Sequence, residues 1–388
     1  MEKTIDNIKP ILIFKGDADV CYGILRYFSD EFSKALLSIG ENVIYFDPKR
    51  DSIRECFGKE YKAVVGFMES FFYNTVPGSN TFLFDLLIGP KFNYWPDHPA
   101  FYYRFVNGFP KNYYILTLDH NYVDYINKHY DNATAFFLPP GATEKSGFIP
   151  FSDREYGLSF LGTFNDYREV LNGFNAADEV TRVVTESYFT YMLQNPNDTT
   201  EYAFEQTLAS LGAEVTEAQF LSELCKIHRI ATNGAARFFK EQVIETIINH
   251  GITVDVFGDS WRQSPFAESE FLKIHPAVTS DRSVDVYRKS QISLNVMTWH
   301  KNSITERVLD SMACGSISLT DETDALRDSF IDGRDILYFS LTDLERIPDI
   351  IRKNLNNEEI ALSGQKKVAS GHTWTDRAFE FLQILNNL

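Results

Sequence analysis

The chain has 388 residues, more than one ordinary hydrophobic core needs and enough for two domains of roughly 150–200 residues each. Its formal net charge of −17 opposes binding to nucleic acid, because that affinity depends on Lys and Arg side chains that neutralise phosphates. The same charge gives no general attraction to anionic lipid, so a basic side chain that meets a phosphate must do so locally, in a pocket.

The first half of the chain alternates short apolar runs with amphipathic stretches. The runs predict buried strands, and apolar residues at helical spacing predict the helices between them. Strand–helix repetition with short connections indicates a mostly parallel sheet covered by helices, a Rossmann-like arrangement. The predicted strands are Ile11–Phe14, Val43–Phe46, Ala63–Phe67, Lys91–Trp95, Tyr114–Leu118 and Ala135–Leu138, and the predicted helices are Gly23–Leu37 and Tyr122–Tyr130.

A break at Pro139-Pro140-Gly141, followed by a polar stretch, predicts the domain boundary. We therefore expect one domain over residues 1–150 and a second over 151–388, which begins with a strand at Leu158–Leu161. The stretch of about 166–237 has helical patterning and few strand signals, so it predicts a helical insertion in the second domain.

Alternation returns after the insertion, and the predicted fold class is therefore α/β with two Rossmann-like domains. The last helix is a candidate for packing back on the first domain. The predicted helices are Phe238–Asn249, Val284–Ser290, Ser303–Met312, Leu341–Asn354 and Thr375–Leu385, and the predicted strands are Thr253–Phe257, Ile292–Val296, Ser316–Leu319 and Ile336–Phe339.

Two of these strands end in glycine, where a ligand can approach the backbone closely. The first ends in Gly162-Thr163, and Arg168 shortly after could fork onto a phosphate. The second ends in Gly258-Asp259, and Trp261 could shield a nucleotide base. The alternative interpretations are an ordinary turn at the first strand and a packed tryptophan at the second.

The segment Ile292–Thr320 is the strongest candidate for a nucleotide site. Ser303 resembles a helix N-cap, and Glu306 three residues later would complete a capping box. Arg307 and Asp310 are three residues apart and hence neighbours on one helix face. They form either a surface ion pair or a functional pair, with Arg307 for a diphosphate and Asp310 for a ribose near a helix N-terminus that attracts anions.

This segment also carries a family resemblance. The run Asp310-Ser311-Met312-Ala313-Cys314-Gly315 resembles the donor-site signature of GT-B glycosyltransferases, which often read Glu-Ala-Met-Ala-x-Gly. Together with Leu294-Asn295, Arg307-Val308-Leu309-Asp310 and the stretch from His372 to Arg377, it resembles bacterial glycosyltransferases of the spore-maturation CgeB type, in the glycosyl transferases group 1. The resemblance covers roughly residues 156–385.

The resemblance implies a GT-B fold, in which two Rossmann-like domains face a cleft. It implies a metal-independent glycosyltransferase of polysaccharide or glycoconjugate biosynthesis, with a nucleotide-diphosphate sugar as co-substrate and no cofactor. The acceptor would be a saccharide, a lipid-linked molecule or a protein. The expected donor-binding residues are Gly162, Thr163, Arg168, Gly258, Asp259, Trp261, Asn295, Ser303, Glu306, Arg307 and Asp310.

The sequence departs from the family pattern at two positions. Asp310 stands where Glu is usual, and Asn302 stands where many retaining relatives have a Glu that contacts the donor sugar. The sugar and the stereochemical outcome are therefore left open.

The first domain should bind the acceptor, and an inverting transferase needs a general base there. The candidates are Asp17, in the loop after the first strand, and His98, for which the alternative interpretation is a turn histidine held by two prolines. Asp119-His120 is a weaker pair, and His275 and His300 lie in predicted loops of the second domain.

The remaining signals are negative. Cys21, Cys56, Cys225 and Cys314 have neither disulfide nor zinc spacing. Asp17 and Asp19 are not followed by further acidic residues at metal-loop spacing, and no Asp-x-Asp arrangement elsewhere indicates a metal-bound nucleotide. Residues 1–6 lack a signal-peptide core, and no run of 18 apolar residues occurs, so we expect a cytoplasmic protein. Two other functions stay open, namely a sugar-nucleotide epimerase of the same architecture and a non-catalytic spore or surface binding protein.

Overall fold

The computed structural model describes residues 9–106, 108–143, 147–174, 177–297 and 299–388. The chain forms two compact units: unit 1 contains Met1–Thr143, Thr279–Asp281 and Gly371–Leu388, and unit 2 contains Glu144–Val278 and Arg282–Ser370. The expectation about residues 1–6 lies outside the described residues. No helix in the described ranges has the length and apolar content needed to cross a membrane.

Unit 1 is built on a sheet of six parallel strands in the order β2-β1-β3-β4-β5-β6. The inner strands β1, β3 and β4 are buried on both faces, as is typical of parallel sheets, whereas the edge strands β2 and β6 are partly exposed. The ends of all six strands differ from the predicted ends by no more than one residue. They are β1 Ile11–Phe14, β2 Val43–Phe46, β3 Ala63–Phe67, β4 Lys91–Trp95, β5 Tyr113–Thr117 and β6 Thr134–Phe137.

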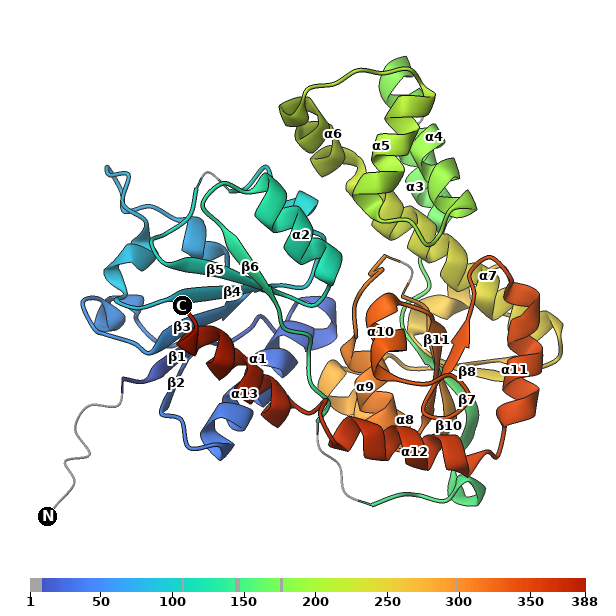
Figure 1. Ribbon diagram of the computed structural model, residues 1–388. Coiled ribbons are helices and arrows are strands. Elements are labelled where there is room, and N and C mark those ends of the chain that lie inside the picture. The colour runs from blue at the N-terminus through green and yellow to red at the C-terminus, as the bar shows by residue number, and fades with distance from the viewer. Residues whose placement is uncertain (1–8, 107, 144–146, 175–176, 298) are drawn as a thin grey trace, which may run out of the picture. The chain divides into compact units, whose positions relative to one another are not determined.

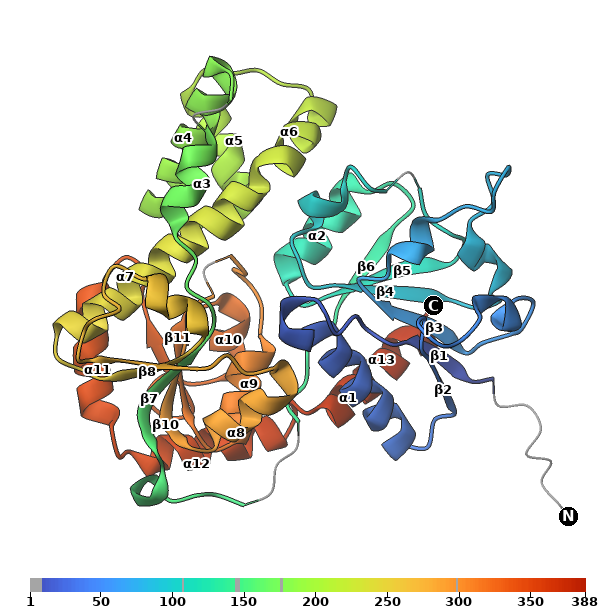
Figure 2. The same cartoon turned by 180° about the vertical axis from the view of Figure 1, so that it is seen from behind.

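Helices α1 (Ile24–Ser38) and α13 (Trp374–Asn386) pack on the unit 1 sheet, and α2 (His120–His129) connects β5 to β6 (Figures 1 and 2). The C-terminal helix α13 contributes Trp374, Ala378 and Phe381 to the same buried core as α1. The end of the chain therefore completes the hydrophobic core of the N-terminal unit.

Unit 2 contains a second sheet of six parallel strands, in the order β12-β11-β10-β7-β8-β9. Two Rossmann-like sheets confirm the predicted α/β fold class. Strand β9 was not predicted from the sequence, because Leu-Lys-Ile-His is short and is followed directly by Pro276. The strands are β7 Tyr156–Leu161, β8 Val254–Phe257, β9 Leu272–His275, β10 Ser290–Asn295, β11 Ile317–Asp321 and β12 Leu337–Phe339.

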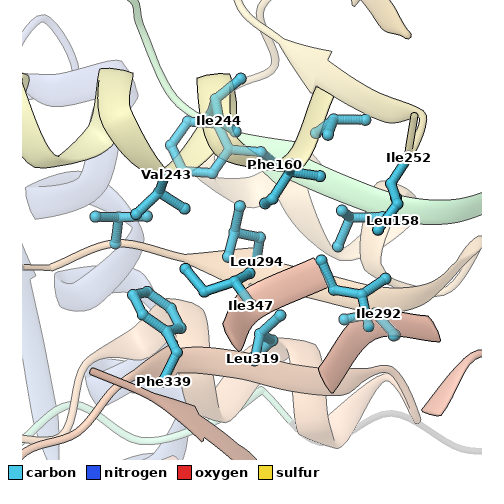
Figure 3. Close-up of a cluster of buried hydrophobic side chains, with 14 of the residues drawn as sticks. Leu158, Phe160, Val243, Ile244, Ile252, Ile292, Leu294, Leu319, Phe339 and Ile347 are labelled. Carbon is cyan, nitrogen blue, oxygen red and sulfur yellow. The ribbon is translucent and has the colours of Figure 1, made fainter. Parts of the chain in front are cut away.

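Helices cover both faces of the unit 2 sheet. Apolar residues of α7 (Ala236–Asn249), α11 (Ile347–Asn354) and α12 (Glu358–Ala369) share one cluster with β7, β10 and β11, including Val243, Leu294 and Ile347 (Figure 3). A second cluster joins Leu161 and Phe257 to α8 (Ser283–Tyr287) and to Cys314, which follows α9 (Glu306–Ala313). Both faces of the sheet are thereby covered by packed helices.

The predicted insertion is helical and consists of α3 (Tyr167–Phe174), α4 (Glu179–Gln194), α5 (Thr200–Ser210) and α6 (Glu217–Arg229). Local signals set the helix starts, since Asp178, Thr199 and Thr216 accept N-cap hydrogen bonds from the main chain. Helix α6 continues through a π-helical segment, Ile230–Ala235, directly into α7. Figures 1 and 2 show α3 to α6 grouped beside the start of α7, away from the unit 2 sheet.

Several helix predictions in unit 2 need correction. Helix α9 begins at Glu306 rather than Ser303, and Leu341–Asn354 is a turn followed by the shorter α11. Helices α10 (Asp324–Ser329) and α12 were not predicted from the sequence. In α12, Gly364 weakens the helical signal, yet it is required because a Cβ there would lie 2.4 Å from the Asp335 carbonyl oxygen.

Candidate functional site

The strand order β10-β7-β8 brings the three predicted strand ends of unit 2 side by side. Gly258 and Gly162 are in direct backbone contact, since a Cβ on Gly258 would lie 2.6 Å from the Gly162 carbonyl oxygen. The Trp261 indole N–H donates to that same oxygen at 2.7 Å. These two contacts thus hold the loop that follows β7 in place.

The base-shielding role of Trp261 is not supported by its position. Its side chain is fully buried, and the ring packs among Phe160, Phe164 and Phe266. A ring enclosed in this way has no face left for a nucleotide base, so Trp261 is a core residue that supports the Gly162 loop. Asp259 beside it is exposed, and its carboxylate accepts a hydrogen bond from the Ala277 N–H at 3.1 Å.

Three basic side chains converge on the chain segment that follows β7. Arg307 Nη1 donates to the Leu161 carbonyl oxygen at 3.3 Å, Lys240 Nζ to that of Thr163 at 3.4 Å, and Arg237 Nη1 to that of Asp166 at 3.2 Å. Arg307 comes from α9, whereas the other two come from α7. We call Arg307, Lys240 and Arg237 the cation cluster.

The cation cluster has more positive charge than its immediate partners neutralise. Glu306 lies 3.7 Å from Arg307 Nε, and the exposed Glu169 lies 3.9 Å from Arg237 Nη1, while in the described part of the chain no carboxylate forms an ion pair with Lys240. Burial, together with the neighbouring charges of Arg307 and Arg237, lowers the pKa of Lys240 to about 7. In a chain of net charge −17, the cation cluster is a local concentration of positive charge.

Lys240 and Arg237 were not identified from the sequence. A lysine in an amphipathic helix normally lies on the solvent face, and its partner here is a main-chain oxygen 77 residues away. The available signal was the cluster of charges in Arg237-Phe238-Phe239-Lys240-Glu241 within an otherwise apolar helix.

Arg168 was predicted to bind a phosphate, but the structure places it in an ion-pair network. Its guanidinium donates to both carboxylate oxygens of Glu241, at 2.6 and 3.1 Å, and to Asp166 at 2.8 Å. Glu241 is almost completely buried. Because two carboxylates already occupy the guanidinium fork, Arg168 is a poor phosphate ligand in this arrangement.

The predicted capping box at the start of α9 is absent, because the helix begins at Glu306 and places Thr305 at the N-cap position without a side-chain cap. Ser303 instead lies before the helix, where its carbonyl oxygen accepts from the Thr323 hydroxyl at 2.7 Å. Asn295, at the end of β10, donates to the Thr320 hydroxyl at 2.9 Å and so ties β10 to β11.

Glu306, Arg307 and Asp310 lie close to one another in the first turns of α9. All three influence the buried Tyr287 of α8, whose pKa is raised chiefly by burial. Burial also raises the pKa of Glu306, which the positive charge of Arg307 opposes. The Asp310 side chain is buried at 1% exposure, whereas the Arg307 side chain is 40% exposed.

The two predicted catalytic residues of unit 1 have different surroundings. Asp17 is exposed in the loop after β1, and its carboxylate accepts from the Asp19 N–H at 3.0 Å. His98 is buried at 3% exposure, accepts from the Ala100 N–H at 3.2 Å and packs edge-on against the Tyr122 ring. Since His98 caps a short 3-10 helix inside the core, it is badly placed to take a proton from an acceptor.

The weaker histidine candidates also have surroundings that differ from one another. His275 lies at the end of β9, not in a loop, where Nε2 contacts Asp255 at 2.7 Å and the ring stacks on Phe257. His300 is buried. His120, the first residue of α2, is exposed and its ring stacks on Phe137 with centroids 3.7 Å apart.

Unit 2 has three features near the carboxyl ends of its central strands. They are the closely spaced backbones of Gly162 and Gly258, the N-terminus of α9 and the cation cluster. These features suit a diphosphate held by N–H groups and basic side chains. Among the described residues, no three His, Cys, Asp or Glu side chains lie together as a metal site would require.

Comparison with known proteins gives a family match over part of the chain. Residues 229–383, which include α7, α9 and the cation cluster, match the model of a family described as "Glycosyl transferase-like". No curated protein sequence matches the chain. The family match agrees with the predicted class of enzyme, a glycosyltransferase.

Solved structures with a similar fold are glycosyltransferases. AviGT4, a glycosyltransferase involved in avilamycin A biosynthesis, is 11% identical with a TM-score of 0.52 and 97% coverage of both chains. An α-glucosyltransferase in complex with UDP and a 13-mer DNA is 12% identical with a TM-score of 0.53, covering 98% of this chain and 100% of that chain. Sucrose-phosphate synthase from Thermosynechococcus elongatus is 12% identical with a TM-score of 0.50 and 98% coverage of both chains. At such identities the likeness concerns the fold, which is that of GT-B glycosyltransferases.

Proposed function

We propose that this chain transfers a sugar from a nucleotide-diphosphate donor, that unit 2 binds the donor, and that Arg307 and Lys240 hold its diphosphate. The observation that carries the proposal is the cation cluster. Its basic groups rest on main-chain carbonyl oxygens at the end of β7 instead of pairing closely with carboxylates. A diphosphate would supply the negative charge that this arrangement lacks, in charge-assisted hydrogen bonds.

The surrounding elements favour the same ligand. The Gly162 and Gly258 backbones leave no room for a side chain between them, and the start of α9 adds the positive end of a helix dipole. During transfer, negative charge develops on the departing nucleoside diphosphate, and preorganised cations at that point stabilise the transition state. The basic groups therefore serve both binding and leaving-group stabilisation.

The remaining roles follow the family resemblance. In this proposal Asp310 contacts the ribose, unit 1 binds a saccharide, lipid-linked or protein acceptor, and Asp17 is the candidate base. The other expected donor contacts, Thr163, Asp259 and Asn295, stay predictions. Membership of the CgeB-type group, independence from metal and cofactor, exclusion of nucleic acid and a cytoplasmic location also stay predictions.

Nucleotide binding by isothermal titration calorimetry tests the donor site. UDP and UDP-glucose are suitable first probes because a structure of similar fold contains UDP, and GDP- and ADP-sugars complete the panel. Lys240→Met and Arg307→Ala should each weaken binding of the preferred nucleotide by about 1.5–3 kcal/mol, the value of a hydrogen bond to a charged group.

Arg352→Met is the matched control, since Arg352 also donates to a main-chain oxygen, that of His250 at 2.6 Å, and to a carboxylate. It should bind the nucleotide like the wild type. If no nucleoside diphosphate binds, or if the Lys240 and Arg307 variants bind as tightly as the control, the proposal fails.

Product analysis separates the proposal from an epimerase or a silent binding protein. With donor alone, a transferase at most hydrolyses the sugar nucleotide slowly, whereas an epimerase converts the sugar while it stays attached. A binding protein would retain the nucleotide without turnover across an acceptor panel.

A further inference from the structure

Helix α9 begins without the side-chain cap that a threonine at its N-cap position normally provides. Thr305 occupies that position, but its hydroxyl makes no cap hydrogen bond. The hydroxyls of Thr305 and Ser303 are buried instead, and neither has a hydrogen-bond partner in the part of the chain that the structure describes. The N-cap side chain therefore does not occupy the N–H groups at the start of α9, which suits a helix end that meets an anion.

The chain that enters α9 is held from outside the helix, by Thr323 at the N-cap of α10. The Thr323 hydroxyl donates to the Ser303 carbonyl oxygen at 2.7 Å and accepts from the Leu326 N–H at 3.2 Å. Thr323 is only 5% exposed, so water does not compete for these hydrogen bonds. One hydroxyl thus caps α10 and fixes the chain just before the first turn of α9.

The residues before Thr323 hold the other end of the connection between β10 and α9. Asp321 Oδ1 accepts from the Met297 N–H at 2.7 Å, where the chain leaves β10. Asn295, the last residue of β10, donates to the Thr320 hydroxyl at 2.9 Å. Both ends of the connection are therefore anchored on the end of β11 and on the turn that follows it.

The first turn of α9 also carries one side chain of the cation cluster. Arg307 follows Glu306, the first residue of the helix, and its Nη1 donates to the Leu161 carbonyl oxygen at 3.3 Å. The chain at Ser303, which Thr323 holds, lies less than two helical turns before Arg307 in sequence. A shift in the entry to α9 would therefore displace both its first N–H groups and Arg307 relative to the end of β7.

We propose that Thr323 is a positioning residue for the donor site: by holding the Ser303 carbonyl oxygen, it fixes the entry into α9 and leaves the first N–H groups of that helix to the donor diphosphate. A capping side chain would fix the same segment, but it would occupy N–H groups that a phosphate needs. The inference rests on the proposed function, in which the start of α9 and Arg307 face the diphosphate.

Substitution of Thr323 tests this role in the full chain, with affinity measured by titration calorimetry for UDP or for whichever nucleoside diphosphate the panel above selects. Thr323→Val keeps the shape of the side chain and removes its hydroxyl. It should weaken binding about fivefold, the effect of one net hydrogen bond. Thr323→Ser retains the hydroxyl and should bind like the wild type.

Thr373→Val is the matched control. Thr373 is also a buried N-cap threonine, at the start of α13 in unit 1, and its hydroxyl both donates and accepts, to and from Asp376. Loss of that hydroxyl should lower the stability of unit 1, because a helix cap is removed. The affinity for the nucleoside diphosphate should stay at the wild-type value.

The choice of ligand gives a readout that a merely structural role would not move. Uridine, or the nucleoside with the same base as the preferred nucleotide, has no phosphate to meet the first turn of α9. Its affinity, measured by saturation-transfer NMR, should therefore be the same in Thr323→Val and in the wild type. General damage to unit 2 would weaken the nucleoside and the nucleoside diphosphate alike.

Three results would overturn the inference: wild-type affinity for the diphosphate in Thr323→Val, a Thr323→Ser variant as weak as Thr323→Val, or an equal loss for the nucleoside. If Thr323→Val does not fold, Thr323→Ala with Thr373→Ala makes the same comparison. Arg307→Ala separates the two levels. Unchanged affinity there refutes the proposed donor site, whereas a loss there with wild-type affinity in Thr323→Val refutes only the role of Thr323.

Discussion

The charges of Arg307 and Arg237 both act on Lys240, so its protonation decides how many positive charges the proposed donor site presents. Its pKa of about 7 means that the free protein loses this charge as pH rises through neutrality. A bound diphosphate favours the protonated form and raises the pKa, and binding therefore takes up a proton above pH 7.

The affinity for a sugar nucleotide should therefore rise as pH falls toward 7 and level off below it. One coupled proton limits the slope to about tenfold per pH unit. Titration calorimetry at several pH values measures the profile, and Lys240→Met is the control in which the dependence should disappear. If the affinity of the wild type does not change with pH, the protonation of Lys240 is not coupled to nucleotide binding.

Asp310 offers a second test at the scale of one side chain. Asp310→Ala should weaken nucleotide binding by about 1.5–3 kcal/mol, because a charged hydrogen bond to the ribose is lost. Since Asp310 is buried, affinity must be measured well below the unfolding temperature of each variant. Ser311→Ala is the matched control, as the buried Ser311 hydroxyl donates only within its own helix, to the Val308 carbonyl oxygen at 2.9 Å. If Asp310→Ala and Ser311→Ala bind the nucleotide equally tightly, Asp310 does not contact it.

At the scale of the elements, the meeting of β7 and β8 depends on glycine. Gly258→Ala would place a methyl group 2.6 Å from the Gly162 carbonyl oxygen and push the β7 loop away from Trp261. We expect a loss of about 1–3 kcal/mol in unfolding free energy, typical of overpacking, together with weaker nucleotide binding.

Gly157, near the other end of β7, provides the control for this substitution. A Cβ at Gly157 would meet only the Leu355 side chain, at an ordinary 3.6 Å. Denaturant unfolding of Gly157→Ala should be close to that of the wild type. Similar destabilisation of both variants would mean that strand propensity, not the contact with Gly162, determines the effect.

The elements also show what could be predicted from the sequence. Strands such as β1 and β3 were predictable because a parallel strand buried on both faces reads as an uninterrupted apolar run. Strand β9 was not, because Lys273 and His275 give it the polarity of a loop at the edge of the sheet. Helix α9 was found, but its start was misplaced, since Ser303 and Glu306 have capping-box spacing without its hydrogen bonds.

The candidate site was predictable only where one segment contains it. Arg307 and Asp310 share α9 and a recognisable motif, so the sequence pointed to them. Lys240 and Glu241 depend on contacts with residues more than 70 positions away, which no local pattern encodes. The same separation in sequence explains why Arg168 was predicted to bind a phosphate. Its partner, Glu241, follows the insertion, 73 positions later in the chain.

At the scale of the whole molecule, the chain returns to unit 1 after completing unit 2. Helix α13 buries Phe381 completely in the unit 1 core, beside Phe32 and Phe92. Phe381→Ala should therefore cost about 3–5 kcal/mol of unit 1 stability. Differential scanning calorimetry should show an earlier transition, while the affinity of unit 2 for nucleotide stays at the wild-type value.

Phe379→Ala is the control on the same helix, because its side chain is 53% exposed and should contribute little. A loss of nucleotide affinity in Phe381→Ala equal to the loss in Lys240→Met would contradict the assignment of the donor site to unit 2.

The continuous helix from α6 through the π-helical segment to α7 has a consequence for engineering. An α-helix advances about 100° per residue, so deleting one residue within Ile230–Ala235 would rotate α6 by about that angle relative to the face that carries Lys240 and Glu241. The π-helical segment thus sets the rotation of the insertion, about the helix axis, relative to the face of α7 that carries Lys240 and Glu241. Deleting or adding a single residue there would rotate the insertion about the helix axis, while α7 stays packed on the sheet.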